Sequence, residues 1–191
     1  TLGVMTNNRF HFGVGVSPWY EDFLATGERW EKRGKRMDEQ IDILKGLMNG
    51  EYFAFKGEFY DIPELKLCPV PTKPVPILIG GHSKLALKRA ARVGDGWISA
   101  GLTLEETKTL IDQINEYRNE FGTLDNPNYQ FQVMGEAAYS PDGIKQLEEL
   151  GATEVIVAFR NTYEGGPDER TLESMITEIN WYADEVINKS K

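Results

Sequence analysis

The chain has 191 residues, and its 21 basic and 30 acidic side chains give a formal net charge of −9. This length predicts one domain with a hydrophobic core, because domains usually hold about 100–200 residues. The acidic balance excludes the basic surface that nucleic acid or an anionic membrane attracts, so we expect neither partner. The one cysteine excludes an internal disulfide, and with only two histidines we expect no metal site.

Membrane and export signals are not found in this sequence. No apolar run approaches the roughly 20 residues that a membrane helix needs, and no basic-then-apolar signal peptide opens it. The single Cys68 fits a reducing compartment. We therefore expect a cytoplasmic protein.

Residues 9–16 (RFHFGVGV) carry an apolar side chain at every second position: Phe10, Phe12, Val14 and Val16. This period of two predicts a strand with one bulky face and one lean face, the latter carrying His11, Gly13 and Gly15. A short helix is expected at 20–25, and helical spacing of apolar residues predicts an amphipathic helix over 28–48. Residues 51–76 hold prolines and an aromatic cluster, which indicates an ordered excursion with room for a small hairpin.

The remainder of the chain alternates between strand and helix patterns. Strands are expected at 76–79, 96–99, 129–136 and 153–159, and helices after Ser83, over 104–121, 141–150 and 167–187. Strand-helix alternation predicts parallel strands joined by right-handed crossovers, as an open doubly wound sheet or a βα barrel. The sequence Gly13-Val14-Gly15 lacks the third glycine and the helix start of a dinucleotide-binding fingerprint, which argues against the open sheet.

The turn Ile79-Gly80-Gly81-His82-Ser83 is the sharpest local signal. Two glycines let the backbone approach a ligand, and the following helix presents free N–H groups to an anion such as phosphate. The alternative is a tight turn with a serine cap and no ligand.

Gly13 and Gly15 lie near the carboxyl end of their strand, where α/β folds gather ligands, and leave room for a flat ring. Small residues that merely fit a crowded barrel interior are the competing interpretation. His11 is interpreted as an interior histidine. Trp97 could equally belong to the core, and Arg160 could equally be a solvated surface residue.

Several segments together resemble the luciferase-like monooxygenase superfamily of flavin- or deazaflavin-dependent (β/α)8 barrels. The resemblance covers about residues 1–122, and the segments that carry it are 1–15, 21–23 (EDF), 33–39 (RGKRMDE), 55–60 (FKGEFY), 69–71 (PVP), 74–83 (PVPILIGGHS) and 89–98 (RAARVGDGWI).

The resemblance implies an oxidoreductase that binds FMN or coenzyme F420 and acts on an unidentified small molecule by hydride transfer or oxygen activation. It implies that Gly80, Gly81, His82 and Ser83 hold the cofactor phosphate, and that Gly15 and Val16 line its ring. Trp97, Ser99 and Arg160 would face a substrate pocket at the carboxyl-end mouth of the barrel. A homodimer is expected for the full-length protein, with the aromatic excursion serving as a lid or a dimer surface.

The length departs from the family pattern. A (β/α)8 barrel runs to about 250 residues, and this chain shows five strands where eight are needed. We therefore expect one luciferase-like domain over 1–191, truncated at its N-terminus so that the first three βα units and any catalytic residue on them are absent. Leu2 and Met5, three apart before an Asn pair, fit the last turn of a helix.

Two alternatives stay open beside the redox enzyme. One is a non-catalytic flavin-binding barrel of the same build. The other is a phosphate-binding barrel isomerase or synthase without a redox cofactor.

Overall fold

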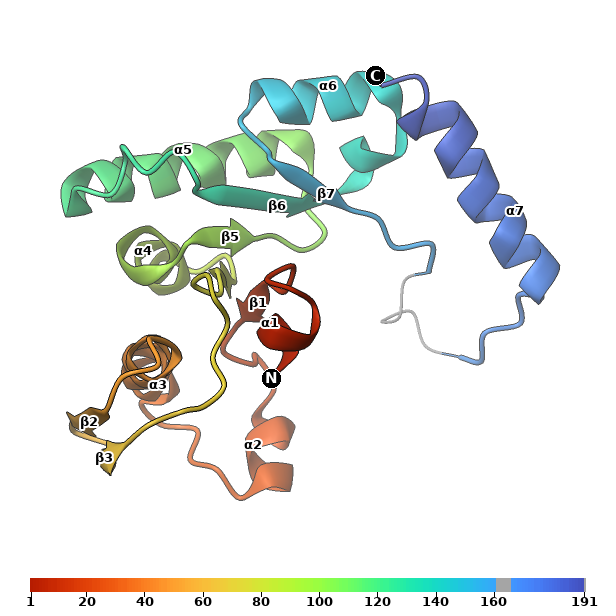
Figure 1. Cartoon of the computed structure of the whole chain (residues 1–191). Coiled ribbons are helices and arrows are strands. Elements are labelled where there is room, and N and C mark those ends of the chain that lie inside the picture. Colours follow the sequence, from red (N-terminus) through yellow and green to blue (C-terminus); the bar gives the residue numbers. More distant parts are fainter. Residues whose placement is uncertain (161–165, 191) are drawn as a thin grey trace.

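A five-stranded parallel sheet forms the centre of the molecule, in the computed structural model, which describes residues 1–160 and 166–190 (Figure 1). The strand order is β1-β4-β5-β6-β7. The strands are β1 (Phe12–Val14), β4 (Ile77–Gly80), β5 (Gly96–Ile98), β6 (Gln130–Met134) and β7 (Glu154–Ile156). The expectation of an α/β fold with five parallel strands is confirmed.

Helices follow the strands along the chain, as the alternation predicts. They are α1 (Leu2–Met5), α2 (Tyr20–Thr26), α3 (Arg33–Met48), α4 (Lys84–Val93), α5 (Leu104–Phe121), the 3₁₀ helix η1 (Glu136–Tyr139), α6 (Pro141–Glu149), α7 (Leu172–Tyr182) and the π-helical η2 (Ala183–Ile187). The excursion contains an antiparallel hairpin of β2 (Phe53–Lys56) and β3 (Asp61–Leu65). Along the described ranges, no helix has the length and apolar character that crossing a membrane requires.

Several elements are shorter than their sequence patterns predict. Strand β1 begins at Phe12 instead of residue 9 because its neighbour β4 begins at Ile77, just after Pro76, which lacks an N–H group. Helix α3 begins at Arg33 instead of residue 28 because Lys32 adopts a left-handed backbone with φ of 56°. The last helix begins at Leu172 instead of 167, where the Thr171 hydroxyl accepts a hydrogen bond from the Ser174 N–H.

One face of the sheet is covered by α3, α4 and α5. Ile77, Ile79, Trp97 and Phe131 belong to this face and pack into one core with apolar residues of the three helices. Full burial of each such side chain contributes about 1.5–3 kcal/mol to stability, so this face holds the domain together. Because successive strand residues point to opposite faces, Gly13, Leu78 and Ile98 belong to the other face; a Cβ on Gly13 would lie 2.8 Å from Ile98 Cδ1.

A charged pair joins α3 to α4. The Arg89 guanidinium is nearly buried and donates from Nε to Asp38 Oδ1 at 2.7 Å and from Nη2 to Asp38 Oδ2 at 3.3 Å. The same Nη2 donates to the Gly34 carbonyl at 2.9 Å. The charged residues of two segments that carry the family resemblance therefore have a structural role.

The hairpin is attached to α3 through Glu39. Its carboxylate accepts hydrogen bonds from the backbone N–H groups of Glu58, Phe59 and Tyr60 at 2.6, 3.0 and 3.1 Å. A Cβ on Gly57 would lie only 2.4 Å from the Glu39 carboxyl group. The segment FKGEFY therefore needs glycine at this point because the carboxylate occupies the space of a side chain.

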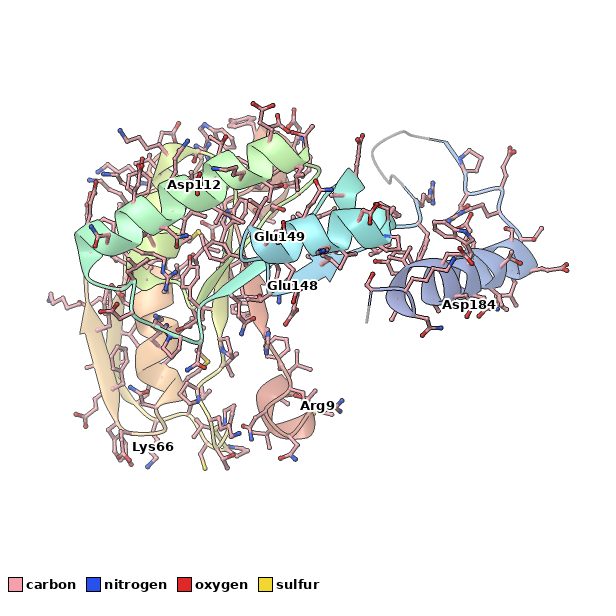
Figure 2. All side chains as sticks on the ribbon, turned by 90° about the horizontal axis from the view of Figure 1, so that it is seen from above. Arg9, Lys66, Asp112, Glu148, Glu149 and Asp184 are labelled. Atoms are coloured by element: carbon pink, nitrogen blue, oxygen red, sulfur yellow. The ribbon has the colours of Figure 1, made fainter. Side chains whose placement is uncertain are left out.

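The C-terminal part forms a smaller unit at the end of the sheet. Val133, Ala138 and Leu147 form a second buried cluster, and the Tyr182 hydroxyl donates to the Ala138 carbonyl at 2.8 Å. Helix α7 projects from the body of the molecule (Figure 1), and Leu172 on it is exposed. Acidic side chains of the helices, such as Asp112, Glu148 and Glu149, are also exposed (Figure 2).

Candidate functional site

The carboxyl ends of β1 and β4 lie side by side, because Val14 and Ile79 are partners in the parallel ladder. A Cβ built on Gly15 would lie 3.8 Å from the Gly80 carbonyl oxygen, and one on Gly80 would lie 3.6 Å from the Val14 carbonyl oxygen. The two glycines, remote in sequence, are thus neighbours at the carboxyl ends of the strands, where α/β folds bind ligands. The absence of two side chains leaves an open strip of backbone there, in which Gly15 is exposed and Gly80 is half-buried.

The turn from Gly80 to Ser83 leads from β4 directly into α4. Gly81 has a φ of +114°, a conformation that favours glycine, and Gly81, His82 and Ser83 are all exposed. The Ser83 hydroxyl accepts a hydrogen bond from the Ala86 N–H at 3.3 Å, so the predicted serine cap is confirmed. Its proton remains available to a ligand.

The first turn of α4 has the properties of an anion site. The N–H groups of Lys84 and Leu85 have no carbonyl four residues earlier within the helix, and the positive end of the helix dipole lies at this turn. The exposed Lys84 adds a positive charge beside them. The exposed backbone, the serine hydroxyl and this charge fit a phosphate group.

The indole of Trp97 holds the turn from within the protein. Its Nε1–H donates to the Gly81 carbonyl at 2.9 Å, and the side chain is fully buried on the helix-covered face beside Phe131. The expectation that Trp97 faces a substrate pocket is therefore corrected. Strand alternation turns it toward the helices and leaves Gly96 and Ile98 for the other face.

Ser99 and Arg160 also have partners within the protein. Ser99 is buried, and its hydroxyl oxygen accepts a hydrogen bond from the Met134 N–H at 2.9 Å, which joins the ends of β5 and β6. Arg160 donates to the Gly166 carbonyl at 2.9 Å and lies 3.5 Å from the Asp168 carboxylate. Ser99 thus stabilises the carboxyl ends of β5 and β6 instead of facing a pocket. Substrate contact by Arg160 stays a prediction.

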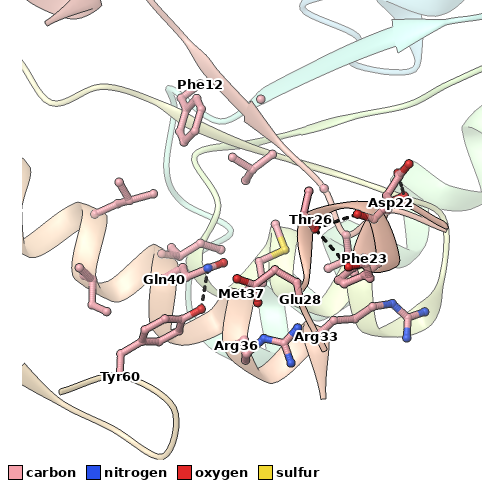
Figure 3. Close-up of a pocket in the computed structure, with 18 of the residues that line it drawn as sticks. Phe12, Asp22, Phe23, Thr26, Glu28, Arg33, Arg36, Met37, Gln40 and Tyr60 are labelled. Carbon is pink, nitrogen blue, oxygen red and sulfur yellow. Dashed lines mark hydrogen bonds between the residues drawn. The ribbon is translucent and has the colours of Figure 1, made fainter. Parts of the chain in front are cut away.

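A cavity of about 870 Å³ lies between β1, α2 and α3 (Figure 3). Gly15 and Val16 line it, together with the apolar Phe12 and Met37. Among the lining residues, Tyr60 accepts a hydrogen bond from Gln40 at 2.7 Å. The turn 80–83 does not line this cavity. The residues predicted to line the ring approach the predicted phosphate turn where Gly15 lies beside Gly80.

The carboxylate of Glu106 lies near the turn and already accepts hydrogen bonds within the protein. Glu106 accepts hydrogen bonds from the Thr103 N–H and hydroxyl, both at 2.9 Å, and these bonds lower the pKa of Glu106. With the Glu106 N–H donating to the Thr103 hydroxyl at 3.2 Å, these bonds form a capping box at the start of α5. Within residues 1–160 and 166–190, no group of three or more His, Cys, Asp or Glu side chains could hold a metal ion.

Of the six residues predicted to bind the cofactor, the structure brings five together at this turn: Gly15, Gly80, Gly81, His82 and Ser83. The sequence did not reveal two hydrogen bonds that hold the turn, from Trp97 to Gly81 and from the Ala100 N–H to His82 Nε2 at 3.2 Å. The local pattern DGWIS gives no sign of these bonds, because they depend on the pairing of β4 with β5.

A five-stranded parallel sheet with helices following its strands is the arrangement from which βα barrels are built. The coenzyme F420-dependent tetrahydromethanopterin reductase of Methanopyrus kandleri has a similar fold, with a TM-score of 0.73 at 14% identity over 98% of this chain and 76% of that one. An F420-dependent secondary alcohol dehydrogenase gives a TM-score of 0.63 at 18% identity, over 97% of this chain and 64% of that chain. Such neighbours are TIM barrels, and the fold assignment is thereby confirmed.

The chain belongs to the luciferase-like monooxygenase family, whose model matches residues 1–142. An uncharacterised protein of Mycobacterium tuberculosis is 45% identical over 99% of the chain, and the chain covers 65% of that relative. An FMNH2-dependent dimethylsulfone monooxygenase of Pseudomonas fluorescens is 35% identical over 60% of the chain and 32% of its own length. An F420-dependent glucose-6-phosphate dehydrogenase of Amycolatopsis mediterranei is 30% identical over 61% of the chain and 36% of its own length.

Proposed function

We propose that the chain is the cofactor-holding part of an oxidoreductase that uses FMN or coenzyme F420 and acts on a small organic substrate. The observation that carries the proposal is the contact of Gly15 with Gly80, which brings the open strip of β1 to the anion-binding turn. The names of the FMNH2- and F420-dependent relatives support both cofactors. Family membership favours this function over an isomerase or synthase without a redox cofactor.

In this proposal the turn binds the phosphorylated tail of the cofactor. The N–H groups of Lys84 and Leu85 and the Ser83 hydroxyl would donate to the phosphate oxygens, and the exposed Gly15 backbone would lie under the ring. The chemistry that such a ring supplies when bound is hydride transfer or oxygen activation. The protein's contribution is to hold the tail and orient the ring.

The test compares each cofactor with the same ring system lacking its phosphate. We predict that the chain binds FMN or F420 in calorimetric titration, and that riboflavin or the tail-less deazaflavin binds at least about tenfold more weakly. Each charge-assisted hydrogen bond is worth about 1.5–3 kcal/mol, which corresponds to about tenfold or more in Kd.

The control is the circular dichroism spectrum, which must show folded protein in every titration. Folded chain that binds neither cofactor would contradict the proposal. Equal affinity for FMN and riboflavin would contradict the role of the turn.

A further inference from the structure

We propose that His82 and Trp97 are positioning residues through which strand β5 fixes the shape of the anion-binding turn, an inference that rests on the proposed function. Two hydrogen bonds carry it, and we call them the two β5 hydrogen bonds. One runs from the Trp97 indole N–H to the Gly81 carbonyl, the other from the Ala100 N–H to His82 Nε2. Gly81 and His82, which are consecutive in the turn, are thus held by Trp97 of β5 and by Ala100 of the loop that follows β5.

The bond from Trp97 acts on the least restricted residue of the turn. Gly81 has no side chain and a φ of +114°, so nothing in its own conformational preference selects this geometry. The buried indole fixes the direction of the Gly81 carbonyl and thereby the plane of the peptide that joins Gly81 to His82. The N–H of His82 is part of that peptide plane, so its direction follows from the bond.

The bond to His82 fixes the state of the imidazole ring. A backbone N–H only donates, so Nε2 must present its lone pair to Ala100, and the neutral ring then carries its proton on Nδ1. Nδ1–H is left as a donor on an exposed side chain. His82 therefore connects the β4–α4 turn to the β5–α5 loop and offers one donor to a ligand.

A preorganised turn binds an anion more tightly because less conformational freedom is lost on binding. Gly80 and Gly81 make this turn intrinsically flexible, and the two β5 hydrogen bonds remove that flexibility in advance. Loss of either bond should weaken binding of the phosphorylated cofactor and leave binding of the phosphate-free ring unchanged.

Two isosteric variants separate the bond to Ala100 from direct contact with the ligand. The amide oxygen of glutamine in His82→Gln reaches the position of Nε2, whereas the amide of asparagine in His82→Asn matches Nδ1. We expect H82Q to retain the preference for FMN over riboflavin, and H82N to lose about tenfold of it, as for one lost hydrogen bond. Trp97→Phe, which keeps an aromatic ring but loses the N–H, should lose a similar factor.

A second readout does not depend on cofactor. The chain has two histidines, so ¹⁵N spectra of the imidazoles contain two ring systems, and His11→Gln identifies that of His82. We expect a neutral Nδ1–H tautomer for His82, and an Ala100 amide whose hydrogen exchange is slow in the wild type and in H82Q but fast in H82N.

The outcomes separate the two proposals. A wild type that does not distinguish FMN from riboflavin contradicts the proposed function, while the exchange of the Ala100 amide still tests the bond to His82. A wild type that prefers FMN, with H82N and Trp97→Phe showing the same preference, overturns the positioning role. Fast exchange of Ala100 in the wild type, or an Nε2–H tautomer, also overturns it.

Discussion

At the scale of single residues, the pKa of the Asp168 carboxyl group is set by neighbouring arginines. Arg170 donates to it from the side chain and the backbone, and these bonds, with Arg160 nearby, lower its pKa from 3.8 to about 2. The folded-state pKa lies below the unfolded value, so the resulting stability is present above pH 3.8 and is lost as the pH falls toward about 2. We predict that Asp168→Asn makes the free energy of unfolding less dependent on pH in this window, as measured by urea titration at several pH values. An unchanged acid-side slope would contradict this.

Single residues also show which features of the site could be predicted from the sequence and which could not. The neighbourhood of Gly15 and Gly80 was predictable, because parallel strands bring their carboxyl ends to one edge. The side of the sheet that Trp97 occupies was not predictable, since a three-residue strand shows alternation without saying which face the helices cover. The hydrogen bond that His82 Nε2 accepts was likewise not predictable, because its donor, the Ala100 N–H, lies in the loop after another strand.

At the scale of elements, the charged pair between α3 and α4 offers a quantitative test. Arg89 is nearly buried and Asp38 is partly exposed, and Arg89 bonds both carboxylate oxygens of Asp38. Arg89→Met removes two hydrogen bonds from Asp38, which keeps the bond from Arg92 at 3.2 Å, so we predict that this substitution lowers the free energy of unfolding by about 2 kcal/mol. Chemical denaturation measures this, and Asp38→Asn completes a double-mutant cycle. Additive effects of the two substitutions would show that the pair does not couple the helices.

Elements were predictable where the sequence carries its own boundary signals. The helix expected at 104–121 is found as Leu104–Phe121, because the Thr103 capping box and Gly122 define its ends. The start of α3 was missed because the left-handed Lys32 has no marker in the sequence. The sequence indicated that the excursion could contain a hairpin but did not locate its strands. The acceptor that holds the hairpin turn, Glu39, lies outside the excursion, on α3.

At the scale of the whole molecule, the sheet is open along two edges. Among the described residues, β1 pairs only with β4, and β7 pairs only with β6. The chain spans 65% of the length of its mycobacterial relative, and the barrel of its structural neighbours uses more strands than this sheet has. The β4–α4 turn follows a strand that is paired on both sides, with β1 and with β5.

The central claim is that one ligand contacts β1 and the β4–α4 turn together. The most direct measurement is a map of backbone amide shifts in ¹⁵N-labelled chain titrated with FMN and, separately, with riboflavin. We predict that FMN shifts the amides of Gly15 and of residues 81–85 at the same ligand concentration, whereas riboflavin leaves those of the turn in place. Shifts from FMN that spare the turn, or that fall on the face of the sheet covered by α3, α4 and α5, would contradict the claim.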